Sequence, residues 1–529
     1  MMSVKEISNY YRKTVMTIEN QLVSKLFKLG NLFFLILGVL WLFSSIYFIY
    51  YYLKIDFTNL SSRQTLFLVC LMAILVFLLW FRKVIVKVFK DLFHFFNCRK
   101  KLVLFVIVVI QFVVTITSIR LASADSTIIY NIATNQDFAL STNYISINPN
   151  NYFLLLWMKL IYLMFGNQTI LMLGIWNIFF IDASICLIYF TNKKCLDKSV
   201  SDLSYFLLVL ILGLSPQYIY TYSDPIALFF LSLSLFLFVM AVKRNYSAVH
   251  MSLAGGVFAV ANGFRPTLLI FAIAGVIVLF KGLVDKKYHS NIKLILRSVL
   301  LFLVSFLCVT QLQSFSLRTQ HFVQFEEDRS RTLLYYIDLG LTHGGNEHAD
   351  LPNDVVSAIG NERNISALSD IHRRLKNHDI SSFTNHLLYK YYWMTNEGMF
   401  GWIQEKVLNE DSHLDNQALL KFQQNTFSRF IRSIVYTQGT RYAYYAASIQ
   451  IVWIVISFSI CIYPFFYSEK EYKLWMQIAI FGGLLYLLIF EAGRTRYLIQ
   501  FLPAVITISA CGLQNSLNFL KRNSLLNKF

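Results

Sequence analysis

Charged residues are scarce in this sequence. Only 14% of the 529 residues are Asp, Glu, Lys or Arg, while 56% are hydrophobic and 16% aromatic. A soluble protein of this size usually carries about 25% charged residues. This balance excludes an ordinary soluble domain and indicates a polytopic membrane protein.

Several chemical motifs are also missing. The seven cysteines lie mostly in or beside apolar runs and form no CxxC pair, so neither a disulfide framework nor a thiolate metal site is indicated. The ten histidines are scattered and show no HExxH spacing. There is no Walker A sequence, no GxSxG and no convincing GxGxxG, so a cytoplasmic nucleotide-driven machine is unsupported. The N-terminus stays polar for about 30 residues, which does not fit a cleavable signal peptide.

What the sequence does contain is a series of long apolar runs. Twelve of them predict membrane-spanning helices, at roughly 31–53, 65–81, 102–118, 170–190, 203–220, 225–242, 249–262, 266–281, 297–314, 442–467, 473–490 and 496–514. The predicted fold is therefore an all-α polytopic membrane protein with about 12 transmembrane helices.

The distribution of charge predicts the topology. The formal net charge is +18, yet residues 315–441 contain 15 acidic and 13 basic residues. The basic surplus lies in short loops between spans, at 82–101, 193–198, 243–244, 281–297 and 470–473, and at the C-terminus. Such loops are cytoplasmic as a rule, so both termini are expected inside and no nucleic-acid partner is needed to explain the charge.

One short apolar run does not fit a span. In residues 144–166, YISINPNNYFLLLWMKLIYLMFG, a polar turn at Pro149, Asn150 and Asn151 opens into an apolar helix shorter than the roughly 20 residues that crossing requires. Counting it as a span would place Lys193, Lys194 and every later basic cluster outside. We therefore expect an interfacial helix in the first outer segment.

This topology divides the chain into four parts. Residues 1–101 comprise a cytoplasmic N-terminus, two appended spans and a basic linker. Residues 102–314 form a transmembrane core with the first outer segment at 119–169, residues 315–441 form a large outer segment, and residues 442–529 hold the last spans and a cytoplasmic tail.

The unusual polar residues then fall on the outer face. They are Asp125, Asn150, Asn151, Asp224, Arg265, Glu491, Arg494 and Arg496. An Asp at a span end can be a solvated residue or a helix cap, and Arg265 can reach lipid headgroups. The sequence FEAGRTRYL is harder to explain in this way, because two arginines beside apolar spans are costly without a partner. Phosphate is a suitable partner, since a guanidinium binds its oxygens in pairs.

Two other charged residues have structural interpretations. Asp182 lies deep in a span, and we expect it to face the interior of the bundle in a structural role. Lys159, on the short helix, is expected either to reach the membrane surface or to meet a headgroup phosphate. The stretch WMTNEGMFGW, with Glu397, fits either a sugar-binding surface or a loop packed at the membrane interface.

The order of these features resembles the GT-C superfamily of multispanning glycosyltransferases. It is similar to the protein O-mannosyltransferase and aminoarabinose transferase group, and more so to Gram-positive membrane proteins with the pattern YxxxxPNNxxLxL. Here the pattern is Tyr144, Pro149, Asn150, Asn151, Leu154 and Leu156, and a late ExxRxRYLIxFLP sequence begins at Glu491. The resemblance covers roughly residues 102–514.

The resemblance implies transfer of a sugar from a polyprenyl-phosphate donor to an acceptor outside the plasma membrane. Asp125 would be the general base, and Arg494, Arg496 and Arg265 would bind the donor phosphate. Asn150, Asn151, Asp224, Tyr222 and Glu491 would bind sugar or acceptor, with Tyr497 in support. The acceptor would be a wall polysaccharide, a teichoic acid, a lipid or a protein. No cofactor is expected, and dependence on a divalent metal stays open.

Two other functions share many of these features. A transporter or flippase of lipid-linked sugars would also have many spans, but it should carry ionisable residues through the bundle, ideally in an internal repeat. A polysaccharide polymerase would use similar substrates, with its arginines mainly in the large outer segment. In this sequence the polar residues gather on one face and arginines also lie at span ends.

Overall fold

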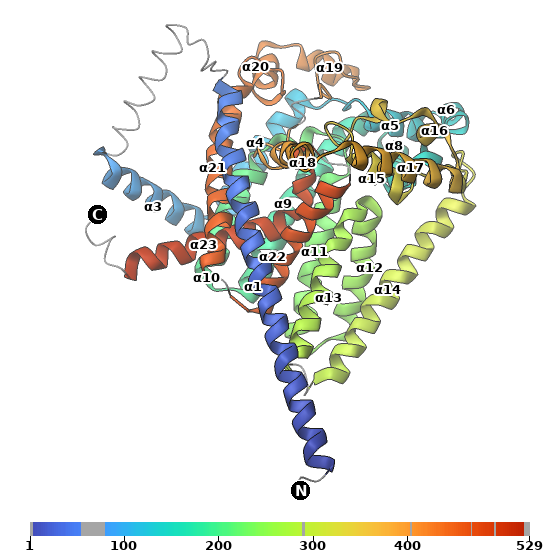
Figure 1. Ribbon diagram of the computed structural model, residues 1–529. Coiled ribbons are helices and arrows are strands. Elements are labelled where there is room, and N and C mark those ends of the chain that lie inside the picture. Colours follow the sequence, from blue (N-terminus) through green and yellow to red (C-terminus); the bar gives the residue numbers. More distant parts are fainter. Residues whose placement is uncertain are drawn as a thin grey trace.

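The computed structural model describes residues 4–53, 80–287, 291–401, 405–466, 468–490 and 493–522. These residues form helices joined by turns, with no strand among them. Within these ranges ten stretches are long and apolar enough to cross a membrane, and the shorter helix α12 (Ala248–Phe264) is also apolar. The predicted span 65–81 lies almost entirely outside the described residues. The all-α polytopic membrane fold is confirmed (Figure 1).

The long helices follow the predicted apolar runs. They are α1 (Val4–Leu53), α4 (Lys100–Ser118), α9 (Thr169–Cys195), α10 (Lys198–Leu208), α11 (Asp224–Lys243), α13 (Leu269–Val284), α14 (Ile292–Thr319), α21 (Tyr442–Ile462), α22 (Glu471–Ile489) and α23 (Leu502–Arg522). A π-helical turn, η3 (Val209–Gly213), and a 3-10 turn, η4 (Pro216–Ile219), continue α10.

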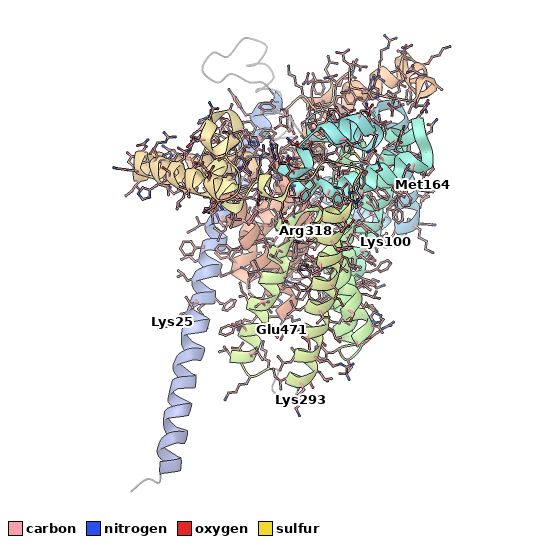
Figure 2. All side chains as sticks on the ribbon, turned by 90° about the vertical axis from the view of Figure 1, so that its right-hand side faces the viewer. Lys25, Lys100, Met164, Lys293, Arg318 and Glu471 are labelled. Atoms are coloured by element: carbon pink, nitrogen blue, oxygen red, sulfur yellow. The ribbon has the colours of Figure 1, made fainter. Side chains whose placement is uncertain are left out.

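The loops separate into two ends of the bundle. At one end Lys281 pairs with Glu469 at 3.2 Å, and the Tyr472 hydroxyl donates to Asn192 Oδ1 at 2.8 Å. Figure 2 shows Lys293 and Glu471 towards this lower end, and Arg318 and Met164 towards the opposite one. The loops that carry Lys281, Asn192 and Glu469 therefore meet in space.

The short helix of residues 152–166 is a separate element. It is α8 (Tyr152–Phe165), entered from the 3-10 turn η1 (Pro149–Asn151) and followed by Gly166 at φ 52°. Its 14 residues are about 21 Å long, which is less than the apolar thickness of a bilayer. The Tyr152 hydroxyl lies 2.9 Å from Ser316 Oγ at the end of α14, so α8 lies beside the outer loops (Figure 1).

Helix α1 packs against α21, in the C-terminal part of the chain. α1 runs along α21, where the rings of Trp41 and Trp453 are 5.5 Å apart. Gln450 of α21 donates to the Ser45 carbonyl at 2.8 Å, and the Tyr391 hydroxyl donates to the Leu37 carbonyl at 2.6 Å. Residues 24–53 of α1 are therefore part of the bundle's packing.

The large outer segment is mostly helical. It contains α15 (Leu333–Gly340), α16 (Asn353–Ser357), α17 (Gly360–Asn377), α18 (Ile380–Thr395), α19 (Gln417–Gln423) and α20 (Thr426–Val435). Lys390 of α18 is completely buried, and its ammonium donates to the carbonyls of Gly340 and Leu488, both at 2.7 Å. Because these acceptors belong to α15 and α22, Lys390 fixes the segment onto the bundle.

Candidate active site

Five segments far apart in the sequence meet at the outer-loop end. They are the start of α5 (Asp125–Thr134), the turn from α7 (Tyr144–Ile147) into η1, residues 220–223 with the start of α11 at Asp224, the α12–α13 link at Arg265, and the 3-10 helix η10 (Thr495–Phe501). Their polar side chains make the contacts described below.

Asp125 is the first residue of α5, and its side chain is partly exposed. Tyr222 donates its hydroxyl to Asp125 Oδ2 at 3.1 Å. The backbone here is tightly held: Ser126 Oγ donates to the Thr221 carbonyl at 2.6 Å, and Ala124 has the strained φ of 65°. The carboxylate is therefore fixed in place yet open to a ligand.

A second tyrosine reaches the same carboxylate from the PNN turn. Tyr144 lies close to Asp125, and its hydroxyl accepts a hydrogen bond from Asn151 Nδ2 at 2.8 Å. Burial, reinforced by the negative charge of Asp125, raises the pKa of the Tyr144 phenol well above its usual value, so it remains a proton donor. Asn150 lies in the same turn and is partly exposed.

Two arginines share one buried carboxylate next to this group. Arg265 Nη2 lies 2.8 Å from Asp224 Oδ1, and Arg496 Nη1 lies 3.9 Å from Asp224 Oδ2. Arg496 also stacks over Tyr222, with 4.8 Å between the guanidinium carbon and the ring centroid. Tyr222 therefore connects the Asp125 carboxylate to the arginines. Asp224 is buried as their partner and is not displayed on an open surface.

Two buried polar atoms at this site make no hydrogen bond among the described residues. Arg265 Nε and Asn262 Oδ1, both near the end of α12, are buried without a hydrogen-bond partner among the described residues. Buried polar atoms of this kind are normally satisfied, and a bound polar ligand or water is the usual means.

The other residues of the late motif lie differently. Arg494 forms an ion pair with Glu405 of the large outer segment. Glu491 falls outside the described residues. The structure therefore brings together Asp125, Asn151, Tyr222, Asp224, Arg265 and Arg496, and it directs Arg494 towards the outer segment.

Glu397 is a buried carboxylate that the sequence presented as part of a surface. It accepts hydrogen bonds from Tyr52 at 3.1 Å and Tyr442 at 3.0 Å, and Thr495 Oγ1 lies 3.4 Å from its other oxygen. Burial raises the pKa of Glu397 to about 7. The interpretation of this residue as part of a sugar-binding surface is wrong, because its partners come from α1, α21 and η10 and enclose it.

Arg331 contacts the residues before the PNN turn, which the sequence did not indicate. Its Nη1 donates to Asn148 Oδ1 at 3.0 Å, and its backbone N–H donates to the Ile147 carbonyl at 3.1 Å. It thus ties the large outer segment to the PNN turn. Its position in a polar, charge-rich stretch gives no signal that could have distinguished it.

The two remaining charged candidates lie outside the cluster. Asp182 of α9 faces the bundle interior, where Gln111 Nε2 donates to it at 3.2 Å, in agreement with the predicted structural role. Lys159 of α8 lies over the Phe322 ring at 4.5 Å.

Comparison with known proteins identifies the family but no activity. No curated protein and no solved structure matches the chain. A family model described as "Conserved hypothetical integral membrane protein" matches residues 16–517, which is nearly the whole chain. The match supports a membrane-embedded protein and names neither a glycosyltransferase nor a substrate. The protein therefore belongs to this family of conserved hypothetical integral membrane proteins.

Proposed function

We propose that this protein is a membrane glycosyltransferase that moves a sugar from a polyprenyl-phosphate donor to a hydroxyl on an extracytoplasmic acceptor. The observation that carries the proposal is the adjacency of an open, oriented carboxylate, Asp125, to two arginines, the buried Arg496 and the partly exposed Arg265. A base next to an anion-binding group is what attack on a phosphate-linked sugar requires.

The reaction can be assigned to these groups step by step. The acceptor oxygen forms a bond to the anomeric carbon while the bond from that carbon to the donor phosphate breaks. Asp125 accepts the proton of the acceptor hydroxyl, and the electron pair of the broken bond stays on the phosphate oxygen. The phosphate thereby gains negative charge, which Arg496 and Arg265 stabilise.

Arg265 keeps a donor for a ligand even while paired with Asp224. A guanidinium has five N–H donors, and Arg265 Nε is buried without a hydrogen-bond partner among the described residues. Arg494, one fifth exposed and paired with Glu405, is a further phosphate contact in this proposal. Asn150, Asn151 and Glu491 remain candidates for contacts to sugar or acceptor.

The same proposal sets the orientation. The basic loops at the other end of the bundle are cytoplasmic by the positive-inside rule, so the site faces outward across the plasma membrane, as in a Gram-positive cell envelope.

The test uses purified protein in lipid vesicles with a radiolabelled polyprenyl-phosphate hexose. We expect transfer, or at least hydrolysis of the donor, and a roughly 100- to 10,000-fold loss in Asp125→Asn, because a general base contributes about that much. Asp137→Asn, an exposed aspartate of the same outer segment, is the matched control.

Two outcomes would contradict the proposal. Full turnover in Asp125→Asn removes this residue as the base. Movement of intact donor across the bilayer without cleavage favours the flippase alternative.

A further inference from the structure

A helix in the basic linker shows an organisation that the proposed function does not use. Residues 82–98 form α3 (Arg82–Cys98), and Figure 1 shows this helix extending away from the bundle. Only Arg99, with non-helical φ −117° and ψ 34°, separates α3 from α4, which begins at Lys100. Since α4 is a membrane span, the end of α3 lies within one residue of the membrane boundary.

One face of α3 attaches it to the bundle. The rings of Phe93 and Phe96 lie 5.5 Å and 5.1 Å from the ring of Phe206 in α10. This contact is small, and it holds the C-terminal half of the helix beside the cytoplasmic ends of the spans.

A second face is apolar and exposed. Val84, Val88, Leu92 and Phe95 follow one another at helical spacing, and each exposes between 43% and 59% of its surface. An exposed apolar face of this kind is more stable among the acyl chains of a neighbouring bilayer than in water.

A third face is basic. Lys83, Lys87 and Lys90 recur at spacings of four and three residues and are exposed. None of the ion pairs formed among the described residues involves these lysines. By contrast Lys100, at the start of α4, pairs with Asp202 at 2.9 Å. The lysines of α3 therefore offer three positive charges to a partner outside the chain.

We propose that α3 lies in the membrane plane on the cytoplasmic leaflet, with its apolar face among acyl chains and its lysines bound to the phosphates of anionic phospholipids. A helix with one side towards the bundle, one towards acyl chains and one towards headgroups belongs at the boundary between the acyl chains and the headgroups of the bilayer. Its 17 residues extend about 26 Å along the leaflet.

The test is spin labelling of the full-length protein in vesicles. Single labels are placed at Val88→Cys and at Lys87→Cys in a background where the native cysteines are serine and the melting temperature is unchanged. Vesicles contain phosphatidylcholine alone or an equal mixture with phosphatidylglycerol. We expect the label at 88 to be accessible to dissolved oxygen and protected from a water-soluble nickel chelate, with the reverse at 87.

A separate variant tests whether the three lysines bind anionic lipid. With phosphatidylglycerol the label at 88 should lie deeper, and the triple variant Lys83→Gln, Lys87→Gln, Lys90→Gln should abolish that difference. The matched control Lys286→Gln, Lys287→Gln, Lys293→Gln removes the same charge at other cytoplasmic loops and should leave the difference intact.

Each contrary result overturns the proposal. Equal exposure of 87 and 88 to the nickel chelate shows a helix off the membrane, and protection of both shows a helix within it. If the depth of the label at 88 does not change with phosphatidylglycerol, the anionic lipid is not the partner of α3. The same holds if the triple variant keeps the difference in depth. None of these readouts depends on glycosyl transfer.

Discussion

At the scale of single residues, the hydroxyls around Asp125 are the most specific feature. Tyr222 donates to this carboxylate, Tyr144 lies close enough for the Asp125 charge to raise its pKa, and Asn151 in turn donates to Tyr144. The PNN turn therefore acts on the candidate base through Tyr144. A hydrogen bond to a charged group contributes about 1.5–3 kcal/mol, so this link is strong enough to matter for alignment.

This link leads to a prediction for Tyr144→Phe. The substitution keeps the ring and removes only the hydroxyl. We expect donor turnover to fall roughly 10- to 100-fold, which corresponds to the free energy of one hydrogen bond to a charged group. The measurement is the initial rate with the lipid-linked donor. Tyr162→Phe, on α8 outside the cluster, serves as control, and an unchanged rate in Tyr144→Phe would rule out this role.

Glu397 predicts a dependence of stability on pH. Burial raises its pKa from 4.5 to about 7 in the folded protein, so the folded state binds the proton more tightly than the unfolded state does. The resulting stability is complete below about pH 4.5 and is lost as the pH rises to 7. It amounts to on the order of 3 kcal/mol.

The check is the melting temperature in detergent between pH 4.5 and 8. The wild type should lose stability across this window, and Glu397→Gln, which cannot ionise, should show a flatter profile. A profile of equal slope in both proteins would mean that Glu397 does not titrate there.

At the scale of elements, the contact between α12 and α14 depends on one glycine. A Cβ at Gly255 would lie 2.3 Å from the Phe302 carbonyl oxygen, whereas a Cβ at Gly256 would meet only Val309 Cγ2 at 3.6 Å. The two backbones approach each other closely at Gly255, as small residues allow in membranes.

These neighbours form a matched pair of variants. Gly255→Ala should lower the melting temperature by several degrees, because backbone cannot move aside at low cost. Gly256→Ala should be neutral or slightly stabilising, since alanine favours a helix by about 1 kcal/mol over glycine. Equal effects at the two positions would contradict the packing described.

Elements also show what local sequence could and could not predict. The spans follow from long apolar runs, and α8 follows from its length and from the basic loops after it. The helical form of 82–98 was not predicted, although its spacing of apolar residues contains the signal. The burial of Glu397 could not be predicted, because Tyr52 lies 345 residues away and only the folded chain brings it close.

At the scale of the whole molecule, the candidate site was predictable in part. A shared outer face was deduced for Asp125, Asp224, Arg265 and Arg496 from loop charge, which restricts residues to one side of a membrane but sets no distance between them. The pairing of both arginines with Asp224 depends on side-chain geometry and was not foreseen. The pairing of Arg494 with Glu405 is of the same kind.

The topology gives a prediction for the intact cell. Cysteines placed at Lys293 and Arg318, at opposite ends of α14, should react differently with a thiol reagent that cannot cross membranes. We expect labelling of Arg318→Cys in whole cells, and of Lys293→Cys only after permeabilisation. The reverse pattern would place the site in the cytoplasm and remove the extracytoplasmic acceptor.

The contact of α1 with α21 sets an order of biosynthesis. Ser45 accepts its hydrogen bond from a residue 405 positions later, and Tyr52 waits for Glu397 and for the neighbouring Thr495. Helix α1 therefore finds these partners only after the later part of the chain has been made. Until α21 is made, Trp41 and the Ser45 carbonyl lack these partners. A chain that stops before α21 keeps the contact of Leu37 with Tyr391 of α18 but lacks the α21 partners of Trp41 and Ser45.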